Sequence, residues 1–131
     1  MSIDRYIGDL EAAISSHSFV SSYTLTIDRK TRDIAFLTGM TEFRNGTALD
    51  FKEFIESKGP IVEKYLYGYN HRLAGSVIFR YDNSPDPHAK TLTSFPHHKH
   101  LQTGELIASD SLIDLSAVLD EVESSYTVNE E

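Results

Sequence analysis

The stretch Ile61–Asp82, IVEKYLYGYNHRLAGSVIFRYD, decides the fold of this 131-residue chain. In its first half an aromatic residue recurs at every second position from Tyr65 to His71. Side chains of a strand alternate between its two faces, so this pattern predicts a strand with one aromatic face. Leu73-Ala74-Gly75 is typical of a three-residue hairpin loop with Gly75 in the left-handed region.

That loop would pair Arg72 with Ser76 and set the aromatic residues of the first strand beside those of the second. The aromatic face would then hold Tyr65, Tyr67, Tyr69, Val77, Phe79 and Tyr81. The opposite, mostly polar face would hold Gly68, Asn70, Arg72, Ile78, Arg80 and Asp82. A two-residue loop would mix aromatic and charged groups, so the longer loop is favoured.

An earlier hairpin is also predicted. Phe19–Ile27 alternates apolar and polar residues, and a second strand follows over roughly Ile34–Arg44. Asn45-Gly46 is typical of a two-residue turn, because both positions tolerate positive φ. Pairing Arg44 with Thr47 across this turn would gather six apolar residues on one face: Ile34, Phe36, Met40, Leu49, Phe51 and Ile55.

Helices are predicted at both ends of the chain. Ser2 can cap a first helix that ends near residues 15–17. Ser111 can cap a second helix, with Asp114 as its capping-box partner. The acidic tail of residues 124–131 is expected to fray. We therefore predict one α+β domain over residues 1–131, a meander sheet of about five antiparallel strands flanked by an N-terminal and a C-terminal helix. Leu106–Ala108 is a further short strand candidate.

Composition narrows the classes of function. The chain has 40% hydrophobic and 24% charged residues and no cysteine, which excludes disulfides and thiolate catalysis. It has no apolar run of membrane-spanning length, so a cytoplasmic protein is predicted. A net charge of −8 argues against a nucleic-acid binder. Residues 60–104, however, hold five basic and three acidic residues and are locally basic.

Four of the six histidines lie between His88 and His100, after or within a proline-containing loop. Arg80 and Asp82 are two apart on a strand and point to the same side. His98 and His100 would do likewise if residues 96–101 are extended, with His97 and Lys99 opposite. Histidine titrates near neutral pH and serves as acid, base or metal ligand.

These residue types suit metal-independent cleavage of RNA. One histidine would take the proton of a ribose 2′-hydroxyl while another protonates the leaving oxygen. Arg80 or Lys99 would stabilise the charge on the phosphorane. The candidate catalytic residues are His98, His100, Arg80 and Asp82. The candidate substrate-binding residues are Lys99, His97, Tyr81 and Arg72.

Two alternatives stay open at this point. His98, His100 and Asp82 form a plausible ligand set for a divalent metal and a metal-dependent hydrolase, although no cofactor is required by the first mechanism. The other alternative is a non-enzymatic module in which the open sheet face and the histidine loop bind a protein.

Three segments together resemble the TumE family of toxins: Lys64–Tyr69, Phe79–Pro85 and Phe95–Leu101. The resemblance covers roughly residues 25–122. It implies the toxin of a type II toxin–antitoxin module whose partner is a small antitoxin, as a homodimer or as a hetero-oligomer with that antitoxin. A ribonuclease is the expected activity by analogy with other toxins, and whether the protein is an enzyme is left open.

Overall fold

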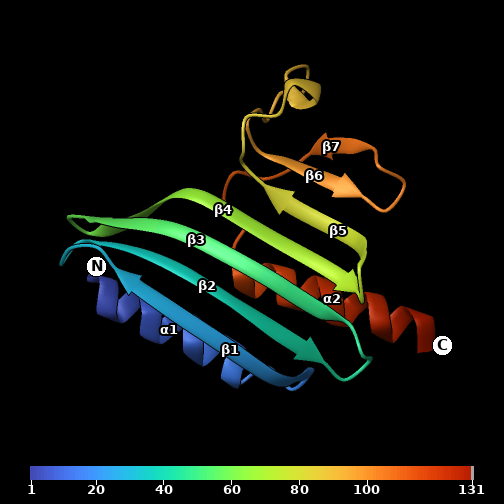
Figure 1. Ribbon diagram of the computed structural model, residues 1–131, viewed down its shortest axis with the longest axis horizontal. Helices are drawn as coiled ribbons and strands as arrows, with labels where there is room; N and C mark the ends of the chain where they lie inside the picture. Colours follow the sequence, from blue (N-terminus) through green and yellow to red (C-terminus); the bar gives the residue numbers. More distant parts are fainter. Residues whose placement is uncertain (131) are drawn as a thin grey trace.

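A computed structural model describes the backbone of residues 1–130 and the side chains of residues 1–126. In this part of the chain seven antiparallel strands form one sheet whose spatial order is the chain order (Figure 1). The strands are β1 (Val20–Arg29), β2 (Ile34–Phe43), β3 (Ala48–Lys58), β4 (Ile61–Leu73), β5 (Ser76–Asp82), β6 (His98–Leu101) and β7 (Leu106–Ala108). The helices are α1 (Ile3–Ser15), α2 (Leu115–Glu130) and the short 3₁₀ helix η1 (Pro87–Ala89).

Both α-helices lie against the same face of the sheet, which we call the helix face (Figure 1). The predicted α+β class and the flanking helices are confirmed. The sheet has seven strands rather than about five, because β6 and β7 extend it past β5. No helix in the described residues is long and apolar enough to cross a membrane.

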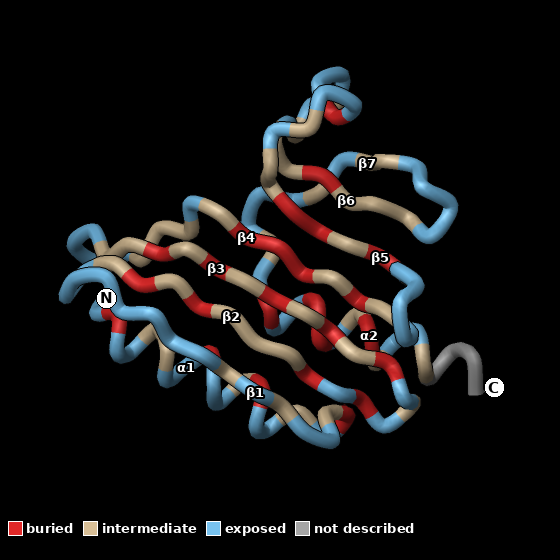
Figure 2. The backbone as a smooth tube through the Cα atoms, in the orientation of Figure 1, coloured by how far each residue is buried: buried red, intermediate tan, exposed pale blue. Residues whose placement is uncertain are grey.

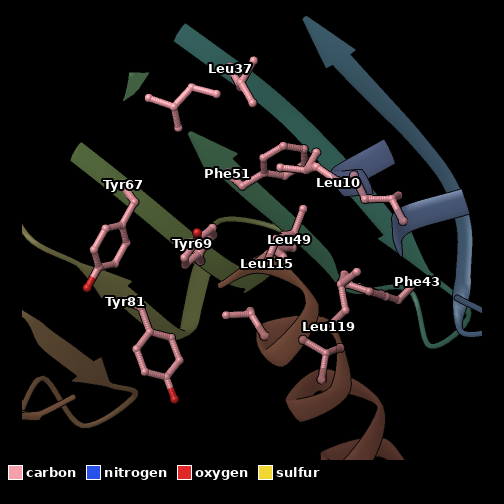
Figure 3. Close-up of a cluster of buried hydrophobic side chains, with 14 of the residues drawn as sticks. Leu10, Leu37, Phe43, Leu49, Phe51, Tyr67, Tyr69, Tyr81, Leu115 and Leu119 are labelled. Atoms are coloured by element: carbon pink, nitrogen blue, oxygen red, sulfur yellow. The ribbon is translucent and has the colours of Figure 1, made fainter. Parts of the chain in front are cut away.

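The core fills the space between the helices and the helix face. Buried and partly exposed positions alternate along β2 and β3 (Figure 2), as expected for strands with one covered face. Leu37 and Leu49 of the sheet and Leu119 of α2 are all fully buried (Figure 3). We call the opposite side of the sheet the open face.

The predicted register between β2 and β3 is wrong by one residue. The loop has three residues, with Gly46 at φ 83°, and Phe43 N–H donates to the Thr47 carbonyl across it. Asn45 accepts from both the backbone and the hydroxyl of Thr47, which holds this longer loop. A one-residue shift exchanges the faces of a strand. The buried residues of β2 are therefore Ala35, Leu37, Thr41 and Phe43, and the apolar residues Ile34, Phe36 and Met40 lie on the open face.

The predicted aromatic face of β4 and β5 is confirmed in its centre, although its loop is shorter. Leu73 pairs with Ser76 around a two-residue turn, with Ala74 at φ 52°. A β-bulge then shifts the register, so that Tyr69 pairs with Tyr81 and His71 with Phe79. The two-residue loop is one residue shorter than predicted, and the bulge contains one extra residue. Beyond the bulge, the side chains of β5 therefore lie on the faces that were predicted.

The helix ends are capped by side chains. Ser2 Oγ accepts the Arg5 N–H at 3.1 Å, as predicted. The second helix starts later than predicted: Asp114, not Ser111, is its cap, with Oδ1 accepting the Ala117 N–H at 2.9 Å. α2 runs to Glu130, past the start of the tail expected to fray. Residue 131 and the side chains of 127–130 lie outside the described part, so fraying stays a prediction.

Candidate functional site

The pairing of β5 with β6 assembles a polar cluster on the open face. Asp82 pairs with His98 and Arg80 with His100, and the four side chains share one face because each strand contributes residues two apart. β7 pairs with the other edge of β6 and fixes it in the sheet. The four residues predicted as catalytic are thus brought together, although they come from segments 16 residues apart.

The cluster converges on the Asp82 carboxylate. His98 Nε2 lies 3.1 Å from Asp82 Oδ1, and His100 Nε2 lies 3.3 Å from Oδ2. Arg80 Nε is 2.8 Å from the same Oδ2. The two imidazoles also meet each other, with their Nε2 atoms 3.1 Å apart. One carboxylate therefore contacts three nitrogen-bearing side chains.

Backbone chemistry fixes the tautomer of His98. Its Nδ1 lies 2.8 Å from the Pro96 carbonyl oxygen, which can only accept, so Nδ1 carries the hydrogen. In neutral His98 the Nε2 atom is then a lone-pair acceptor that faces a carboxylate oxygen and a second imidazole. At least one of the two imidazoles must carry a proton at Nε2, or a cation must lie among these atoms.

The cluster consists of a buried inner pair, Asp82 and His98, and a more exposed outer pair, His100 and Arg80. The side chains of Asp82 and His98 are 2% and 1% exposed, whereas those of His100 and Arg80 are 26% and 43% exposed. Burial lowers the pKa of His100, and the charges of His98 and Arg80 act in the same direction while Asp82 opposes them. A lowered pKa keeps this imidazole neutral at neutral pH, as a base must be.

Two hollows in the open face reach the outer pair. One is lined by Asp86, His88, His100, Gly104 and Leu106. The other is lined in part by Arg80 and by residues of β3 and β4. Because Arg80 and His100 are cross-strand neighbours, a molecule on this face could touch both.

The donor atoms of Asp82, His98 and His100 also suit a metal ion. They all lie within 4.8 Å of one another. Ligands about 2.1 Å from a tetrahedral zinc would lie about 3.3 Å apart, close to the separations observed here. Asp82 Oδ2 is buried and has no aligned hydrogen bond despite its ion-pair contacts. The donor set therefore fits a divalent cation as well as a proton network.

The predicted substrate-binding residues do not join the cluster. His97 Nδ1 lies 2.9 Å from the Tyr67 hydroxyl and its ring stacks on Tyr67. Lys99 and Tyr81 both bond Glu121 of α2, at 2.7 and 2.6 Å. These three face the helices, because alternation along β5 and β6 places them opposite the cluster. They are therefore not available to a ligand of the open face.

Arg72 is on the open face but is engaged elsewhere. Its Nε donates to Asp50 Oδ2 at 2.6 Å near the β4–β5 turn. Sequence reasoning missed Lys52, which lies beside Gly68 in the hollow that contains Arg80. Its signal was the parity of β3, because Lys52 alternates with the apolar residues Leu49, Phe51 and Ile55.

A family model for the toxin TumE matches residues 10–126, nearly the whole chain. The protein therefore belongs to the TumE toxin family, as the three motif segments indicate. No curated protein and no solved structure matches the chain.

Proposed function

We propose that this protein is the cytoplasmic toxin of a toxin–antitoxin pair and that it cleaves RNA at the Arg80–Asp82–His98–His100 cluster. The observation that carries the proposal is the convergence of two imidazoles and a guanidinium on one buried carboxylate. Membership of a toxin family supplies the biological setting and implies an antitoxin partner.

The difference in exposure between the inner and the outer pair determines the role that each residue has in the proposed mechanism. His100 contacts the inner cluster through Nε2, so its Nδ1 can meet a substrate. Nδ1 would take the proton of a ribose 2′-hydroxyl, whose oxygen then attacks the phosphorus. The resulting imidazolium, stabilised by Asp82, would return that proton to the leaving 5′-oxygen. Arg80 would stabilise the phosphorane charge. Products would end in a 2′,3′-cyclic phosphate and a 5′-hydroxyl.

The inner pair has a positioning role in this proposal. His98 is fully buried and is fixed by Pro96, so it holds the His100 ring rather than touching RNA. Asp82 compensates the charge that His100 gains. This differs from the sequence-based expectation that both histidines contact the substrate.

The direct test is RNA cleavage by the purified protein in EDTA, with the ends of the products identified. We expect cleavage by the wild type and loss of it in His100→Gln. His97→Gln is the matched control, because His97 lies on the helix face against Tyr67. Cleavage by His100→Gln at the wild-type rate would sink the mechanism. Growth arrest on expression without an antitoxin tests the toxin role separately.

A second candidate is a metal-dependent hydrolase, favoured by the triangle of donor atoms. Metal-bound histidines commonly donate their other ring nitrogen to a carbonyl, as His98 does to Pro96. Asp82, His98 and His100 would hold the ion, which would act as a Lewis acid on the phosphate. Restoration of activity by a divalent cation after EDTA treatment would favour this candidate; full activity in EDTA would exclude it.

A further inference from the structure

A groove runs across the open face beside the cluster. It encloses about 420 Å³ and is lined by residues of β2 to β5, among them Thr38, Asp50, Lys52, Gly68, Asn70 and Arg80. Gly68 forms part of its floor, since it pairs with Asp82 on one side and with Lys52 on the other. Because Gly68 has no side chain, the side chain of Lys52 can lie over β4 at this point.

Lys52 reaches over this glycine. A Cβ atom built on Gly68 would lie 3.2 Å from Lys52 Cε, so the lysine side chain lies across β4 toward β5. In the described part of the chain Lys52 has no ion pair and no hydrogen bond. The neighbouring carboxylate, Asp50, is already bound by Arg72. The groove therefore contains a cation without an internal counter-charge, next to the exposed guanidinium of Arg80.

The groove also has an amide and an aromatic neighbour. Asn70 Oδ1 is buried and has no hydrogen-bond partner. Phe54 lies two residues from Lys52 along β3, on the same face, in a row of rings with Phe36 and Tyr65 at centroid distances of 6.3 Å each. Cationic and aromatic groups on one sheet face are the features that bind the backbone and bases of single strands.

The excess of acidic residues is concentrated in the two terminal segments of the chain. Residues 1–16 and 109–131, which include both α-helices, hold ten acidic residues and one basic residue. Residues 17–108, which form the sheet and its loops, hold eleven basic and ten acidic residues. The net charge of −8 therefore belongs to the helix layer and not to the sheet. The strand and loop segment as a whole is therefore close to neutral.

We propose that this groove binds single-stranded RNA across the open face. Lys52 binds a phosphate adjacent to the scissile one, and Phe54 stacks on a base. Gly68 leaves room for the Lys52 side chain to lie across β4 toward the cluster. The inference rests on the proposed cleavage at Arg80 and His100, and it adds where the rest of the strand lies.

The test is binding of a fluorescent, fully 2′-O-methylated RNA decamer, which lacks the attacking hydroxyl. Anisotropy is followed over a range of salt concentrations. Lys52→Gln should weaken binding and reduce the slope of log K against log salt by about 0.7, the value for one phosphate contact on a single strand. Lys30→Gln is the matched control, because Lys30 is paired with Asp28 at the end of β1.

Two further variants test the floor and the aromatic contact. Gly68→Val should weaken binding by filling the groove, since a β-branched residue suits a strand. Phe54→Ala should weaken it about fivefold or more by removing a stacking surface. Unfolding midpoints identify any variant that fails to fold, and Lys52→Gln, on a partly exposed side chain, is the variant that decides.

The outcomes separate the groove from the cleavage mechanism. A wild type that does not bind the decamer, or equal salt slopes for Lys52→Gln and Lys30→Gln, would overturn the RNA path even if RNA is cleaved. A lower slope for Lys52→Gln in a protein that cleaves no RNA would support the groove and reject the proposed activity. Loss of antitoxin binding alone in Lys52→Gln would make the groove a protein interface and overturn the proposal.

Discussion

The segment His97–His100 divides its three histidines between the two faces of the sheet, and the two environments differ in how they satisfy the ring nitrogens. On the helix face, the ring of His97 bonds the neutral hydroxyl of Tyr67, and Lys99 pairs with Glu121. On the open face, His98 and His100 meet each other and one carboxylate. Histidine content alone therefore identifies no site; the convergence of ring nitrogens on a shared charge does.

His71 extends the comparison, because it is a second histidine of the helix face. Thr47 donates its hydroxyl hydrogen to Asn45, so His71 Nε2 must be the donor in its 2.9 Å bond to Thr47. His71 Nδ1 is buried without a partner. A second proton on this ring would have no acceptor, which accords with the lowering of the pKa of His71 by burial to about 4.

The largest expected difference between the faces is in activity. His100→Gln should lower the rate of RNA cleavage by about 10²- to 10⁴-fold, the usual effect of removing an acid–base group. Arg80→Gln should lower it by about 10²- to 10³-fold, because it removes the charge that stabilises the phosphorane. His97→Gln, one side chain away on the other face, should leave the rate unchanged. Initial rates on one RNA substrate provide the measurement. A loss in His97→Gln as large as in His100→Gln would remove the functional distinction between the faces.

The next largest effect is a loss of stability at acidic pH, which we expect from His71 on the helix face. The unfolded chain protonates His71 near the ordinary pKa, whereas the folded protein resists protonation until about pH 4. The stabilising contribution of neutral His71 is thus complete above about pH 6.5 and declines as the pH falls toward 4. Between pH 7 and pH 4.5 this should lower the free energy of unfolding by about 2 to 3 kcal/mol.

Urea denaturation at the two pH values measures this loss. His71→Gln cannot gain the proton and should show a smaller pH dependence than the wild type. His88→Gln, at an exposed loop position, should keep the wild-type dependence. If His71→Gln retains the full dependence as well, another group causes the acid loss.

A smaller effect is expected for the ion pair of the helix face. Glu121→Gln removes the charge that pairs with Lys99 and leaves one acceptor oxygen where Lys99 and the Tyr81 hydroxyl now use two. This should cost about 1 to 2 kcal/mol of stability. Adding Lys99→Met should recover part of that loss, because it removes the unpaired charge. A double-mutant cycle of unfolding free energies measures the coupling. Both variants should cleave RNA normally; reduced cleavage would mean that the faces are functionally linked.

The smallest expected effect is the stability change in His97→Gln. The variant loses the stack on Tyr67 but keeps a group that can bond its hydroxyl. We expect a loss of about 1 kcal/mol or less in the free energy of unfolding. A loss of several kcal/mol would show that His97 is a main support of the core.

The sequence predicted the structure best where polar and apolar residues alternate with the two-residue period of a strand. The aromatic face of β4 and β5 and the shared side of Arg80 and Asp82 follow from strict alternation. The same alternation placed His98 and His100 together and His97 and Lys99 opposite. These are local properties of single strands, and a strand of known polarity needs no distant contact to define its faces.

The register between β2 and β3 and the first residue of α2 could not be predicted from such alternation. β2 has apolar residues on both faces, with Phe36 on one and Leu37 on the other, so hydrophobicity could not choose between two registers. The sequence before α2 offers two capping residues, Ser111 and Asp114, and the packing of Leu115 and Val118 into the core favours the later one. The groove residue Lys52 was missed because the prediction gave no register between β3 and β4, which sets Lys52 beside Gly68.

The meander order of the sheet has a consequence for how the protein is made. Every strand pairs only with its neighbours in the chain, so the sheet can grow strand by strand during synthesis. Asp82 and Arg80 emerge before His98 and His100, and the cluster closes only when β6 is held by β7. At roughly 5 to 20 residues per second, the ribosome needs about one to five seconds to add the residues from Asp82 to Ala108. During that interval a nascent chain has most of its sheet and an incomplete reactive centre.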